Sequence, residues 1–101
     1  MGNWNNGPVA PGSTTVTMTS ANTEYSYTFD GSKRNVLLQL NDSAVAWRWS
    51  WTQGVVAAGN GHYVPAGGSI LQESPPASGT VIYFSSASAS MTMRVSYELR
   101  A

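Results

Sequence analysis

The sequence contains no cysteine, which excludes disulfide bonds and thiolate-ligated metal sites. Charge is also scarce, because only 10% of the 101 residues are charged and the formal net charge is zero. Nucleic-acid binding requires a basic surface that neutralises phosphates. Among the five basic residues, only Lys33 and Arg34 are adjacent. We therefore expect no nucleic-acid partner.

Long apolar runs are absent as well. No segment approaches the roughly 18 consecutive apolar residues that indicate a membrane span. The first residues lack the charged and apolar regions of a secretory signal. These absences predict a protein that is made in the cytoplasm and has no membrane partner.

Groups that could carry catalysis are few and scattered. His62 is the only histidine, and it adjoins a predicted turn at residues 59–61, where a histidine is more often solvated than functional. A zinc site would need about three further donors at workable spacing. The carboxylates lie apart in the sequence, at Glu24, Asp30, Asp42, Glu73 and Glu98. We therefore predict that the protein is not an enzyme and that it binds no cofactor or metal ion.

What the sequence does contain is a series of short segments in which apolar and polar residues alternate. This period of two is typical of β-strands, and no window shows the stripe of an amphipathic helix. The clearest segment is 91–99, and further strands are expected at 15–19, 24–29, 34–40, 44–51, 70–73 and 80–84, with 54–58 either a short strand or part of a long loop. Turn signals separate these segments about every ten residues. The predicted fold is all-β: a single antiparallel β-sandwich or jelly-roll-like barrel of about seven or eight short strands.

Two parts of the chain differ in composition. Residues 1–12 consist largely of Asn, Gly and Pro, which cannot pack a core, so we predict a flexible N-terminal arm there. Residues 13–101 form the predicted β-sandwich domain. Trp4 is the one large apolar side chain in the arm, and it is either an exposed ring or a group that docks on a partner.

Three tryptophans lie at every second position of one predicted strand. Trp47, Trp49 and Trp51 therefore share one face of it, and Arg48 lies on the other. The rings could fill the core, although each aromatic side chain buries roughly 150–250 Å² and three would crowd a small domain. They could instead bury against a second subunit, since Trp and Arg are enriched at interface hot spots. They could also form a flat platform on which sugars stack. Together with Trp4, these are the candidate interface or binding residues.

Three segments of the chain combine strands and turns in a distinctive way. In residues 33–43 (KRNVLLQLNDS) a basic residue opens an apolar strand that ends in an Asn-x-Ser type turn. In residues 64–70 (VPAGGSI) a Pro/Ala-Gly-Gly turn leads to the next strand, and an aromatic strand follows at 81–84. Together these segments resemble small structural proteins of tailed-bacteriophage virions. The resemblance spans roughly residues 33–99, and the tryptophan row and the arm have no counterpart in it. It implies a capsid decoration, or cement, protein that clamps neighbouring capsomers as a homotrimer.

The sequence therefore favours a non-enzymatic bacteriophage virion protein on the capsid surface. Its expected partners are the major capsid protein and copies of itself. A closely related hypothesis is that the protein belongs to the tail or to a fibre of the virion. The alternative is a carbohydrate-binding or receptor-binding β-sandwich module that uses the tryptophans as a platform for a glycan.

Overall fold

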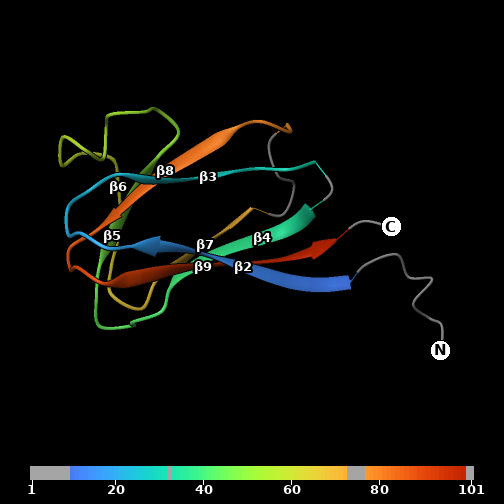
Figure 1. The fold of residues 1–101 in the computed structure, drawn as a ribbon, viewed down its shortest axis with the longest axis horizontal. Coiled ribbons are helices and arrows are strands. Elements are labelled where there is room, and N and C mark those ends of the chain that lie inside the picture. The colour runs from blue at the N-terminus through green and yellow to red at the C-terminus, as the bar shows by residue number, and fades with distance from the viewer. Residues whose placement is uncertain (1–9, 32, 73–76, 100–101) are drawn as a thin grey trace.

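The computed structural model describes residues 10–31, 33–72 and 77–99 of the chain. Trp4 and residues 1–9 of the predicted arm lie outside the described residues. The described part is all-β. Its strands, labelled as in Figure 1, are β2 (Ala10–Met18), β3 (Tyr25–Thr28), β4 (Lys33–Leu40), β5 (Trp47–Ser50), β6 (His62–Val64), β7 (Ser69–Gln72), β8 (Val81–Ser86) and β9 (Met91–Leu99). The predicted all-β class and the predicted number of strands are confirmed.

The strands form two four-stranded antiparallel sheets in a sandwich-like arrangement (Figure 1). One sheet has the order β2-β9-β4-β7, and the other has the order β3-β8-β5-β6. Between consecutive strands the chain crosses from one sheet to the other at every connection except that between β5 and β6. Each crossing brings strands that are distant in sequence into register, so the fold is stabilised mainly by long-range contacts.

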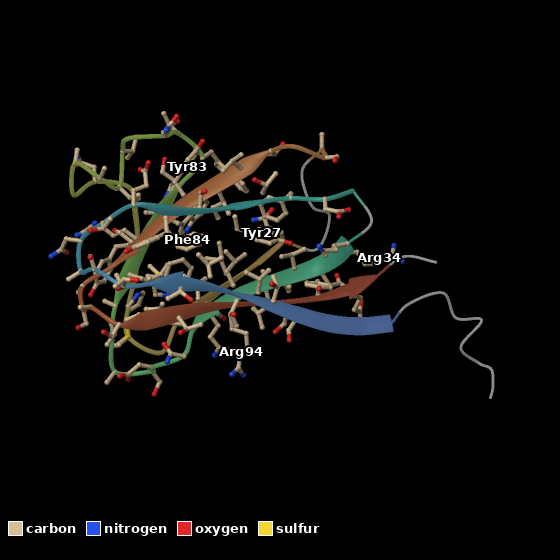
Figure 2. The ribbon with its side chains drawn as sticks, viewed as in Figure 1. Tyr27, Arg34, Tyr83, Phe84 and Arg94 are labelled. Carbon is tan, nitrogen blue, oxygen red and sulfur yellow. The ribbon has the colours of Figure 1, made fainter. Side chains whose placement is uncertain are left out.

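The core lies between the sheets and follows the predicted alternation. On β4 the burial pattern places Val36, Leu38 and Leu40 inside. Figure 2 shows Phe84 of β8 and Tyr27 of β3 pointing into the space between the sheets. Full burial of an aliphatic or aromatic side chain of this size contributes about 1.5–3 kcal/mol. The other buried apolar side chains are Met18, Phe29, Trp47, Val56, Val64, Ile82, Met93 and Val95.

Several strand boundaries differ from the predicted ones. β2 begins at Ala10, so the prediction that Ala10, Pro11 and Gly12 belong to the flexible arm is wrong, and these residues are part of a strand. β6 was not predicted as a strand. The segment 54–58, for which a strand or a loop was expected, consists of turns. β8 extends through Ser85 and Ser86, where a turn was predicted. No helix in the described part of the chain is long and apolar enough to cross a membrane.

Candidate functional site

The three predicted tryptophans form a row that runs from the core to the solvent. Trp47 is 2% exposed, Trp49 is half-buried against the core, and Trp51 is 39% exposed. The indole N–H of Trp47 donates a hydrogen bond to the carbonyl of Gly68 at 3.3 Å, which gives the buried ring the partner it needs. Trp47 is therefore a core residue and presents no surface to a partner.

The outer tryptophans belong to an aromatic cluster made of Phe29, Trp49, Trp51 and His62. The imidazole of His62 stacks on the Trp49 indole, with ring centroids 4.5 Å apart and planes 29° apart. The Trp51 ring meets Trp49 edge-on, at 5.3 Å and 80°, and lies 5.9 Å from Phe29. Because the Trp49 and Trp51 rings are nearly perpendicular, they do not share one flat surface.

The loop between β5 and β6 is fixed by a carboxylate from another part of the chain. The oxygens of Glu24 accept the backbone N–H of Gly54 at 3.0 and 3.2 Å, and one of them accepts the N–H of Ala57 at 3.4 Å. Gly61, at the end of the loop, passes close to the Trp49 carbonyl, where a side-chain Cβ would come within 2.7 Å of the oxygen. These contacts set the wall of the surface described next.

A polar groove lies on the outer face of the β3-β8-β5-β6 sheet. It consists of two hollows, of about 290 and 330 Å³, that share Asn22, Arg48 and Ser85 in their lining. The first hollow continues toward Tyr63, and the second is bounded by the 56–59 segment of the loop. We call this surface the Arg48 groove.

Arg48 is the charged residue in the lining of the groove, and no carboxylate in the described part of the chain lines the groove beside it. The Arg48 guanidinium lies 5.1 Å from the centroid of the Tyr63 ring, a cation–π contact that fixes its position. Lys33 forms an ion pair with Asp30, whereas Arg48 has no carboxylate partner among the described residues. Tyr63 itself is 59% exposed, so much of its ring remains open to a ligand.

The remaining groups of the groove are neutral and polar. Ser85 is buried in β8 beside Arg48, its partner in register on β5. Asn22 has a φ of +54°, in the left-handed region, and its N–H donates to the Ser86 carbonyl at 2.8 Å. Asn tolerates this conformation better than most residues, and the hydrogen bond holds its backbone in place.

The alternation along β5 predicts that Arg48 lies on the opposite face from the tryptophans, and Arg48 does line the outer groove. The sequence gives no sign that Asn22, Tyr63 and Ser85 are the neighbours of Arg48. Arg48 pairs in register with Tyr63 of β6 and with Ser85 of β8, and no local pattern reveals which strands will be adjacent. The only available signal was the period of two in β5.

The hydroxyl of Tyr27 is perturbed by its position inside the fold. Burial raises the pKa of the Tyr27 hydroxyl above its usual value of 10.0, and the nearby Lys33 ammonium acts in the opposite direction. This hydroxyl is buried without a hydrogen-bond partner among the described residues. Within the same residues, no group of three or more His, Asp or Glu side chains is placed to hold a metal ion.

No protein-family model matches the chain, and no curated protein matches it either.

Proposed function

We propose that the chain is a non-enzymatic structural protein of a bacteriophage virion, specifically a capsid decoration protein that binds the major capsid protein and copies of itself as a homotrimer. The observation that carries the proposal is the pairing of the strands. Of the eight strands in the described residues, the first four pair with the last four in reverse order, as β2·β9, β3·β8, β4·β7 and β5·β6. We assign this order to the jelly-roll class, an eight-stranded architecture of viral capsid and lectin domains.

An apolar surface at one sheet edge supports self-association. Leu71 on the edge strand β7 is 51% exposed, and it pairs in register with Leu37, which is half-buried on the same outer face. A domain of this size buries a modest share of its surface, so covering such a patch adds stability. We therefore place the contact between copies at Leu37 and Leu71.

Light scattering coupled to size exclusion, with the full chain, tests the oligomeric state. We expect a trimer that binds saturably to phage capsids lacking this protein. A monomer that does not bind such capsids would overturn the proposal.

The contact between copies has a matched pair of variants. Leu71→Asp places a charge in the contact and is expected to give folded monomers whose melting temperature is lower, because the stability added by the contact is lost. Thr15→Asp adds the same charge at an exposed position of β2 in the same sheet and should leave the trimer intact. If both variants remain trimeric, the contact lies elsewhere.

The glycan-platform alternative receives less support from the geometry. Trp47 is buried, and the rings of Trp49 and Trp51 meet nearly at right angles. A sugar could stack on the exposed Trp51 alone, but the three tryptophans do not offer it a continuous surface.

A further inference from the structure

The floor of the Arg48 groove consists of strands whose backbones are already paired. β5 lies between β8 and β6, and β8 lies between β3 and β5. An extended peptide gains most of its affinity by pairing with a free strand edge, and neither β5 nor β8 offers one. The edge strand of this sheet is β6, which carries Tyr63, and its free edge lies on the side away from β5. A ligand that lies over β5 and β8 is therefore recognised mainly by side chains.

Those side chains offer three kinds of contact. The Arg48 guanidinium supplies a positive charge and a fork of N–H donors that matches a carboxylate. The amide of Asn22 and the hydroxyl of Ser85 suit the hydroxyl groups of a ligand. The exposed ring of Tyr63 provides an apolar face beside them.

The size of the groove limits what it can hold. Each hollow, at about 290 and 330 Å³, is near the lower end of the range of about 300–1,000 Å³ that is usual for small-molecule sites. Because the two hollows meet at Arg48, one charged group can sit at the centre while neutral parts extend to both sides.

From these contacts we propose that the Arg48 groove binds an acidic saccharide, a short chain of sugars that carry carboxylates. The carboxylate pairs with Arg48, the sugar hydroxyls bond to Asn22 and Ser85, and one sugar ring lies against Tyr63. This site is on the opposite face of β5 from the tryptophans and does not depend on the role proposed for the protein in a virion.

The test is a calorimetric titration of the full chain with trigalacturonic acid. The neutral galactotriose and a short poly-glutamate peptide are titrated in parallel. We expect trigalacturonic acid to bind about tenfold or more tightly than either, with an affinity that falls as salt is added. Failure of trigalacturonic acid to bind, equal binding of galactotriose, or tighter binding of the peptide would each overturn the proposal.

Variants then locate the site. Arg48→Gln and Tyr63→Ala should each weaken trigalacturonic acid binding about tenfold or more. Arg94→Gln is the matched control, because Arg94 is exposed on the outer side of the other sheet (Figure 2). Equal weakening by Arg94→Gln would show that the binding is a general effect of charge and would overturn the site.

A measurement on the unaltered protein keeps the proposal testable if a variant does not fold. In a titration followed by ¹⁵N-resolved NMR, the amide signals of Arg48, Tyr63 and Ser85 should shift. Shifts confined to Trp51 and His62 would assign the saccharide to the aromatic cluster instead and refute the groove. A monomeric protein that still binds trigalacturonic acid would contradict only the decoration role.

Discussion

The carboxylate of Glu24 accepts the backbone N–H of Gly54, which lies thirty residues further along the chain, at 3.0 Å. It also accepts the N–H of Ala57. One side chain just before β3 therefore holds the loop between β5 and β6, and with it one wall of the Arg48 groove.

Replacing Glu24 by Gln should loosen this loop. The variant keeps the shape of the side chain but loses its charge and replaces one acceptor oxygen with a donor. We expect the free energy of unfolding to fall by about 1 kcal/mol. Hydrogen exchange should become faster at Gly54 and Ala57 while Val95, in the core strand β9, serves as the internal control. Unchanged exchange at Gly54 would contradict the assigned role.

Two glycines of the same loop separate the effect of backbone conformation from that of close contact. Gly59 and Gly61 both have left-handed φ angles, of +85° and +104°, but only Gly61 lies against other atoms. Gly59→Ala should cost about 1–2 kcal/mol for the backbone conformation alone. Gly61→Ala should cost at least about 2 kcal/mol more, because its Cβ would meet the Trp49 carbonyl. Urea denaturation measures both, and equal losses would show that the loop moves aside.

The tryptophan row predicts unequal effects of the same substitution. Trp47→Ala removes a buried ring and should destabilise the fold by about 3–5 kcal/mol. Trp51→Ala removes a ring that is 39% exposed and should cost about 1 kcal/mol, mostly its contact with Trp49. Chemical denaturation followed by circular dichroism compares the two variants. Similar losses would mean that Trp51 is covered in solution.

Tyr27 should make the fold sensitive to alkaline pH. Burial raises its pKa in the folded state, so the unfolded chain loses this proton first as the pH passes about 10. The contribution of Tyr27 is thus complete below pH 10 and falls as the pH rises toward the folded pKa. Tyr27→Phe removes this loss and also removes a hydroxyl without a partner.

At pH 7, Tyr27→Phe should leave stability unchanged or raise it by up to about 1 kcal/mol. Urea denaturation between pH 7 and 11 should show the variant gaining on the parent protein above pH 10. A parallel decline of the two proteins would contradict the role of Tyr27, and so would a large loss at pH 7.

The alternation of apolar and polar residues along the chain predicts the longer strands correctly. The bounds of β9 agree with those predicted, and those of β4 differ by one residue, because buried residues alternate with more exposed ones in the middle of each strand. β6 spans only His62–Val64, which is too short to show a period. β2 was predicted too short because Pro11 and Gly12 indicate irregular structure. An edge strand tolerates proline, since one side of its backbone has no neighbour to bond.

The candidate site was harder to predict than the fold. The period of two gave the shared face of the tryptophans but not their graded burial, which arises because β5 ends at Ser50 while the row continues into the loop. The Arg48 groove depends on which strands flank β5, and its lining comes from β5, β6, β8 and four of the connections between strands. That information lies in long-range pairing, which a single sequence does not display.

Ala10 and Leu99 pair across β2 and β9, so the two ends of the described sandwich lie side by side. Figure 1 shows them at the opposite end of the molecule from the β2–β3 and β5–β6 loops, which border the Arg48 groove. A polypeptide joined to Ala10 or to Leu99 would therefore extend from the same end of the domain. The domain is thus suited to insertion into a loop of another protein, where it would project on two adjacent stems with the loops that border the groove at its far end.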